Sequence, residues 1–66
     1  MKNSIKVERA IHDLTQEQLA QKLGVSRQTI HAIESNKYVP STLLALKLAR
    51  LFGKQVGEIF RLEEED

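Results

Sequence analysis

The chain has 66 residues, and its composition narrows the possible folds before any motif is considered. A globule of this size is one domain at most and buries only about 60% of the surface that its unfolded chain exposes. Only three residues are aromatic, so the core must be built mainly from Leu, Ile, Val and Ala, which favours packed helices over a sheet sandwich. The sequence contains no cysteine, which excludes a disulfide framework and a thiolate zinc site.

The charge is unevenly distributed along the chain. The formal net charge is +1, yet residues 1–62 carry all ten Lys and Arg residues and only five of the nine acidic residues. A basic body of this kind is compatible with binding a polyanion. We expect residues 1–62 to form one domain and residues 63–66 to form a solvated acidic tail. No apolar stretch approaches the roughly 20 residues of a membrane span and no basic-then-apolar leader opens the chain, so we expect a cytoplasmic protein with no membrane partner.

Apolar residues near the amino terminus recur with helical spacing. Val7, Ala10, Ile11 and Leu14 fall at i, i+3, i+4 and i+7, which is the spacing of one helical face. The pattern predicts a first helix at about residues 4–13, with its apolar face at these positions.

The next two helices are marked by their end residues. Thr15 and Gln18 form a capping-box pattern that predicts the start of a second helix, and Gly24 predicts its end about nine residues later. Ser26 is a good N-cap for a third helix at about residues 26–35, followed by Asn36, which tolerates the left-handed conformation that ends helices. The inner stripes are formed by Leu19, Ala20 and Leu23 in the second helix and by Ile30 and Ile33 in the third.

A fourth helix is predicted at about residues 41–52, capped by Ser41 and ended by Gly53. Its inner half consists of Leu44, Ala45, Leu48, Ala49, Leu51 and Phe52. Leu43 and Leu46 fall on the opposite side, where a lone monomer would prefer polar groups. Two explanations remain open for this second patch: scattered surface leucines, which are normal, or a surface for a partner.

The last part of the domain combines a helical turn with a strand pattern. Val56, Ile59 and Phe60 predict one apolar turn of a short fifth helix. After it, residues 60–63 alternate apolar and charged, a pattern that can pair as a short strand with residues 1–4. The predicted fold is therefore all-α with five helices, with or without a short terminal two-stranded β pair.

Two capped helices joined by a tight turn at Gly24 and Val25 match the helix-turn-helix, whose second helix lies in the major groove of DNA. The segment LTQEQLAQKLGVSRQTIHAIESNK at residues 14–37 closely resembles the lambda-repressor and Cro-like family, also called the xenobiotic-response-element type. The likeness continues through Tyr38 to Ile59 and Phe60. The chain is similar to short stand-alone members of the family such as the cytolysin-operon repressor. These members are homodimers with a small terminal strand pair.

The resemblance implies which residues contact DNA. It makes residues 26–35 the recognition helix, and the implied DNA-binding residues are Gln16, Ser26, Arg27, Gln28, Thr29, His31, Ala32, Asn36, Lys37 and Tyr38. The side-chain chemistry agrees independently, because Arg can donate two hydrogen bonds to guanine and Gln can pair with adenine. His31 stands where close relatives often have asparagine, so both its contact and its protonation are open.

Two structural contacts are also expected, the first from the resemblance and the second from the small core and the second apolar patch of the fourth helix. Arg9 and Glu34 are expected to form an ion pair between the first and third helices. A homodimer is expected to form through the carboxy-terminal half, with interface residues Leu43, Leu46, Val56, Ile59 and Leu62. In the competing arrangement the terminal strand pair covers the second patch of the fourth helix within one chain, which leaves a monomer.

The expected function is a sequence-specific transcriptional regulator, specifically a repressor that binds an inverted-repeat operator in double-stranded DNA as a homodimer. Two alternatives are an antitoxin that binds a toxin and its own promoter, and a bridging coactivator that holds protein partners. His12 and His31 lack the spacing of paired metal ligands, and no catalytic arrangement accompanies them. We therefore expect no enzymatic activity, no metal and no cofactor.

Overall fold

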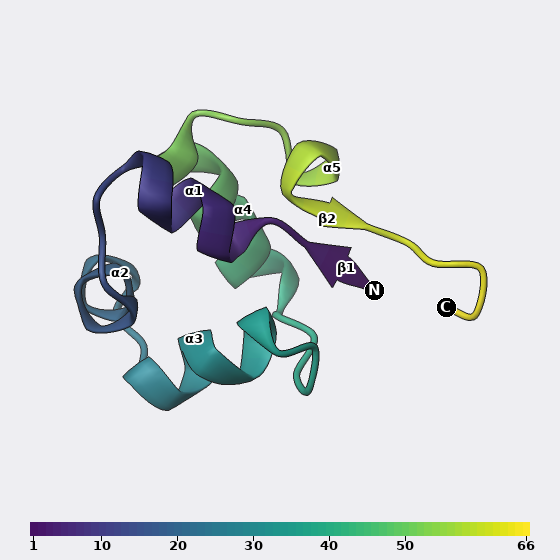
Figure 1. Ribbon diagram of the computed structural model, residues 1–66, viewed down its shortest axis with the longest axis horizontal. Coiled ribbons are helices and arrows are strands. Elements are labelled where there is room, and N and C mark those ends of the chain that lie inside the picture. Colours follow the sequence, from purple (N-terminus) through teal and green to yellow (C-terminus); the bar gives the residue numbers. More distant parts are fainter.

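The computed structural model describes all 66 residues and contains five helices and two short strands (Figure 1). In chain order the elements are β1 (Lys2–Asn3), α1 (Ile5–Ile11), α2 (Gln16–Leu23), α3 (Arg27–Glu34), α4 (Thr42–Phe52), α5 (Val56–Ile59) and β2 (Phe60–Arg61). The predicted five-helix fold is confirmed, and the terminal strand pair that the sequence left open is present. None of the helices combines the length and apolar character that crossing a lipid bilayer requires.

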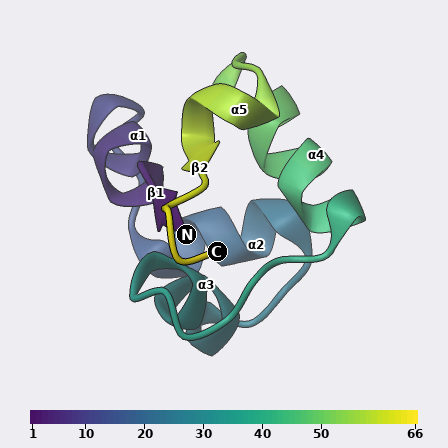
Figure 2. The same cartoon turned by 90° about the vertical axis from the view of Figure 1, so that its right-hand side faces the viewer.

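The helices surround one core of twelve buried apolar residues. Figure 2 shows α1 and α4 on opposite sides, α5 across one end, and α2 and α3 at the other end. Every helix contributes at least one side chain, and the residues with almost no exposure are Ile5, Leu19, Ile30, Ile33, Leu48 and Ile59. Helix α3 therefore has a single buried stripe of two isoleucines, and its other residues are partly or fully exposed.

The predicted helix ends are present as hydrogen bonds. The Thr15 hydroxyl accepts the Gln18 backbone N–H at 3.0 Å, and the Gln18 side chain accepts the Thr15 N–H at 2.9 Å. The Ser26 and Ser41 hydroxyls each accept the N–H three residues later at 3.2 Å. Gly24, with φ of 73°, then ends α2 in the left-handed conformation. These groups satisfy backbone donors and acceptors that a short helix otherwise leaves unpaired.

The apolar face predicted for the first helix is wrong. Val7 and Ile11 are 58% and 65% exposed, whereas Ile5 and Glu8 are the buried residues of α1. Ile5 enters the core at the very start of the helix, which rotates the buried face away from Val7 and Ile11. Leu14 lies beyond the end of α1 and packs against the core from the loop.

Glu8 can occupy a buried position because a lysine reaches it from the far end of α4. Lys54 Nζ donates to Glu8 Oε2 at 2.6 Å, and this hydrogen bond raises the pKa of Lys54. A buried carboxylate needs such a partner to offset the loss of its hydration. The pair ties α1 to the loop between α4 and α5.

The two strands join the ends of the domain in an antiparallel pair, with Lys2 opposite Arg61 and Asn3 opposite Phe60. Ser4 extends the ladder by donating its N–H to the Ile59 carbonyl at 2.9 Å. Residues 63–66 are all exposed. Within them Asp66 accepts the Glu63 N–H and the Met1 ammonium, and these two hydrogen bonds lower the pKa of Asp66.

Gly24 and Gly57 offer a matched test of the turn between α2 and α3. A Cβ atom meets nothing within 4 Å at either position, but only Gly24 has a positive φ. We expect Gly24→Ala to cost about 1–2 kcal/mol, because the left-handed conformation is strained for alanine. Gly57→Ala, within a helix, should be neutral or slightly stabilising. Thermal unfolding of both variants checks this, and a Gly24→Ala midpoint at or above that of Gly57→Ala would contradict it.

Candidate nucleic-acid interface

Helices α2 and α3 are joined by a turn of three residues, and they pack directly against each other. After Gly24 the backbone N–H of Val25 donates to the Ala20 carbonyl at 3.0 Å, which closes the end of α2. Ser26 then caps α3. Together α2, the turn at Gly24 and α3 form a compact helix-turn-helix unit. Helix α3 lies along one outer edge of the molecule (Figure 1).

The exposed face of α3 begins at its first residue. Arg27, Gln28 and His31 are exposed, while Ala32 is half-buried. The side chains of Arg27 and Gln28 form no hydrogen bond or salt bridge within the protein. Their donors and acceptors are therefore available to a ligand at the amino-terminal end of α3.

Ser26 and Thr29 lie at the same end, but their hydroxyls are partly engaged. Ser26 Oγ lies 2.9 Å from Thr29 Oγ1, and it also accepts the Thr29 backbone N–H. The expected contacts of these hydroxyls with phosphate therefore stay a prediction. One of the two hydroxyls donates to the other, so one hydroxyl hydrogen of the pair remains available to a phosphate oxygen.

Arg9 and Glu34 are in contact at the other end of α3. Arg9 Nε lies 2.6 Å from Glu34 Oε2, and Arg9 Nη2 donates to Glu34 Oε1 at 3.1 Å. The Arg9 Nη1 atom donates to the Leu14 carbonyl at 3.0 Å, and the hydrogen bonds with Glu34 raise the pKa of Arg9. The two side chains are 15% and 8% exposed, so this fork is largely shielded from water. It links α1, the loop before α2 and the end of α3.

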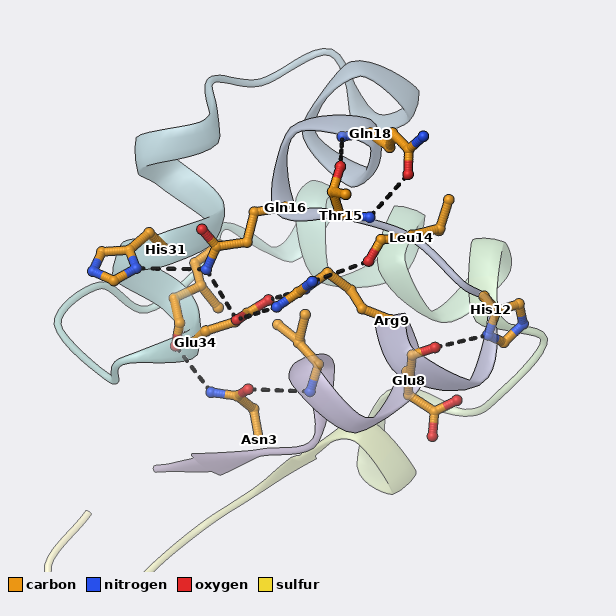
Figure 3. Close-up of polar contacts among 12 residues, drawn as sticks. Asn3, Glu8, Arg9, His12, Leu14, Thr15, Gln16, Gln18, His31 and Glu34 are labelled. Atoms are coloured by element: carbon orange, nitrogen blue, oxygen red, sulfur yellow. Dashed lines mark hydrogen bonds and ion pairs between the residues drawn. The ribbon is translucent and has the colours of Figure 1, made fainter.

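Gln16 joins the same group from the start of α2 (Figure 3). Its Nε2 atom donates to Glu34 Oε1 at 3.1 Å and lies 3.5 Å from Nδ1 of His31. The side chain therefore turns toward the protein. The expected contact of Gln16 with a phosphate therefore stays a prediction, because its amide is engaged with Glu34 and His31.

The carboxyl end of α3 carries the remaining predicted contacts. Asn36 adopts a left-handed φ of 61°, and Lys37 follows it with its N–H donated to the Ala32 carbonyl at 2.9 Å. Asn36, Lys37 and Tyr38 are all exposed. The only Lys or Arg side chains in salt bridges are those of Arg9 and Lys54, so the charges of Arg27 and Lys37 are unpaired at the two ends of α3.

Asn3 contributes to this site although the sequence analysis did not single it out. Its Nδ2 atom donates to the Ile33 carbonyl at 2.9 Å and to Asn36 Oδ1 at 3.1 Å. Asn3 thus holds the last turn of α3 from strand β1. Its Oδ1 atom also accepts the Ile5 N–H at 3.2 Å, but the contacts that link it to α3 lie 30 residues or more along the chain, so no local pattern predicts them.

The second patch of α4 remains open in the structure. Leu43 and Leu46 are 64% and 55% exposed, so the arrangement in which the terminal strands cover them is wrong. Leu46 lines an apolar groove of about 410 Å³ together with Val39, Pro40, Val56 and Phe60, among others. Leu62 is exposed as well. Ile59 is 1% exposed and belongs to the core, so its expected place in an interface is wrong.

The comparison with known proteins agrees with this geometry. A family model described as Helix-turn-helix matches residues 5–59, which includes every helix of the chain. The chain belongs to the lambda-repressor and Cro-like helix-turn-helix family. This family is non-enzymatic, and no group of three or more His, Asp or Glu side chains is arranged to hold a metal ion.

Several relatives match over the whole chain. An uncharacterized HTH-type transcriptional regulator of Methanocaldococcus jannaschii is 58% identical over 66 residues, with both chains fully covered. A second, YgzD of Bacillus subtilis, is 48% identical with both chains fully covered. A third, from Archaeoglobus fulgidus, is 46% identical and covers all of this chain and 93% of the relative. The whole chain, and not only α2 and α3, therefore aligns with nearly the whole length of these relatives.

Removal of Glu34 tests the structural importance of the shielded ion pair. We expect Glu34→Ala to lower the free energy of unfolding by about 1–3 kcal/mol, because two guanidinium donors of Arg9 lose their acceptor. For a domain of this size each kcal/mol corresponds to a fall in melting temperature of about 4–8 °C. The matched control is Glu64→Ala, which removes an exposed carboxylate without an ion pair. Equal melting temperatures for the two variants would show that the pair has no structural role.

Proposed function

We propose that this protein is a sequence-specific DNA-binding transcriptional regulator that inserts α3 into the major groove. The observation that carries the proposal is the free, exposed pair Arg27 and Gln28 at the start of the second helix of the helix-turn-helix unit. The N-terminal residues of the second helix are those that contact base edges in this motif. The names of the full-length relatives, which describe transcriptional regulators, support the same conclusion.

The proposed base contacts follow from side-chain chemistry. Arg27 can donate two hydrogen bonds to guanine O6 and N7, and Gln28 can pair with adenine N6 and N7. Ala32, one turn further along α3, can offer only a methyl contact. His31 lies on the same exposed face and is a third candidate for a polar base contact.

The proposed phosphate contacts flank these bases on both sides. Lys37 is the strongest candidate, because its positive charge is unpaired. Phosphate contacts fix the register of the protein on the duplex. Asn36 and Tyr38 lie beside it, and the hydroxyls of Ser26 and Thr29 lie at the opposite end of α3. We assign these contacts to the domain of residues 1–62 and leave the acidic tail outside them.

We further propose a homodimer that places two recognition helices on two half-sites. The open apolar groove beside Leu46 supports it, because a small monomer rarely leaves such a surface uncovered. Val56 lines the same groove. We assign Leu43 and Leu62 to the same interface, which would be isologous around a twofold axis. Operator half-sites would then be inverted repeats about 34 Å apart. Repression is the proposed outcome, because occupancy of an operator blocks polymerase without any further contact.

Replacement of Arg27 tests the recognition helix. After selection of bound sites from a random DNA library, we expect Arg27→Ala to cost about 1–3 kcal/mol at the selected operator. It should also relax the preference at one base position, because the bidentate contact with guanine is lost. An unchanged selected site and an unchanged affinity would show that α3 is not the recognition helix, and would favour a role in holding protein partners.

Lys37→Ala is the matched comparison, because it also removes one unpaired positive charge. We expect it to weaken specific and non-specific DNA binding alike, since a phosphate contact carries no sequence information. The slope of log K against log salt should become shallower by about one unit. Titrations at several salt concentrations measure this, and a changed base preference in Lys37→Ala would contradict the phosphate assignment.

Sedimentation equilibrium at micromolar concentration tests the homodimer. We expect a mass twice the 7.5 kDa of one chain. Leu46→Glu should return the protein to the monomer, since it places a charge in the apolar groove. The control is Val7→Glu, which places the same charge on an exposed apolar residue of α1, away from the groove on α4. It should leave the dimer intact. A mass of one chain for the unaltered protein would exclude the dimer, and dissociation by both variants would place the interface elsewhere.

A further inference from the structure

The two ring nitrogens of His31 face different surroundings. Nδ1 lies 3.5 Å from Nε2 of Gln16, and the other nitrogen points away from the neighbouring residues (Figure 3). A neutral imidazole carries one hydrogen, so one nitrogen donates and the other accepts. Whether Nδ1 donates to or accepts from Gln16 therefore decides whether Nε2 of His31 presents an acceptor or a donor to solvent or DNA.

Arg9 sets the direction of the hydrogen bonds that connect it to Glu34, Gln16 and His31. A guanidinium only donates and a carboxylate only accepts, so the fork between Arg9 and Glu34 has one possible direction. Glu34 Oε1 also lies 3.1 Å from the amide of Gln16. Gln16 must turn its NH₂ group toward this carboxylate, because its carbonyl oxygen would meet a second acceptor there.

The same NH₂ group has a second hydrogen, and Nδ1 of His31 is the atom beside it. That nitrogen has to accept, which puts the ring hydrogen on Nε2. We propose that the hydrogen-bonded series of Arg9, Glu34 and Gln16 holds His31 as the Nε2–H tautomer. On the function proposed above, His31 then donates to an acceptor on a base edge. In the major groove the acceptors are purine N7, guanine O6 and thymine O4, whereas cytosine presents a donor. His31 thus disfavours cytosine at the base that it faces.

His12 provides an internal contrast within the same chain. Its Nδ1 atom lies 2.9 Å from the backbone carbonyl of Glu8. A carbonyl oxygen only accepts, so the hydrogen of neutral His12 belongs on Nδ1. The two histidines are therefore expected in opposite tautomers.

Nitrogen-15 NMR of the full chain at about pH 8, where an ordinary imidazole is neutral, tests the assignment without DNA. Long-range proton–nitrogen correlations should show the Nε2–H pattern for His31 and the Nδ1–H pattern for His12. Gln16→Glu replaces the donor beside His31 by an acceptor of the same shape. It should move His31 toward the Nδ1–H form and leave His12 unchanged, which also reports that the variant is folded. An Nδ1–H pattern for His31 in the unaltered chain, or an unchanged His31 pattern in folded Gln16→Glu, would overturn the inference.

Selection from a random DNA library tests the consequence for recognition. We expect His31→Ala to lose a preference on the order of fivefold at one base position, which is the value of one hydrogen bond. Gln16→Glu should change the preference at that same position. If Arg27→Ala changes the site while His31→Ala does not, this inference fails and the proposed function stands. If neither variant changes the site, the proposed function fails as well.

Discussion

The ion pair between Arg9 and Glu34 is the interaction on which the arrangement of the helix-turn-helix unit depends. Helix α3 has eight residues and only two buried side chains, and a helix this short has little stability of its own in water. Its orientation must therefore come from tertiary contacts. The shielded fork joins α1 and α3, and through the Leu14 carbonyl and the Gln16 amide it also joins the loop before α2 and the start of α2 itself.

A second anchor works with this pair at the same end of α3. Asn3 donates to the last turn of the helix from strand β1, and β1 is paired with β2. The carboxyl end of α3 is thus connected to both halves of the domain. Toward its amino-terminal end α3 is held by the Ser26 cap and by the buried side chain of Ile30. The end that bears Arg27 and Gln28 is the more open one, as a surface for a large ligand requires.

Local patterns in the sequence were sufficient to predict most of the fold. Thr15, Ser26 and Ser41 mark helix starts because a hydroxyl beside unpaired N–H groups acts within three residues, and Gly24 marks an end through its own conformational freedom. The alternation after Phe60 left the pairing of the two terminal strands open, and the structure contains it. Long-range contacts were harder to foresee: the burial of Glu8 depends on Lys54, 46 residues away, and the role of Asn3 depends on Ile33 and Asn36. Helical spacing predicts that Ile59 lies on an apolar face, but it does not predict whether that face meets the core or a partner. The path of the chain between α4 and β2 places Ile59 in the core.

The shared hydrogen bonds of Glu34 have a consequence for attempts to exchange specificity between regulators. Helix α3 carries Glu34, but the groups that satisfy this carboxylate belong to α1 and α2. Grafting the eight residues of α3 onto another scaffold would leave behind Arg9 and Gln16. The graft would then carry a carboxylate without its donors and a histidine whose ring is free to change tautomer. The transferable unit is the helix together with those two partners.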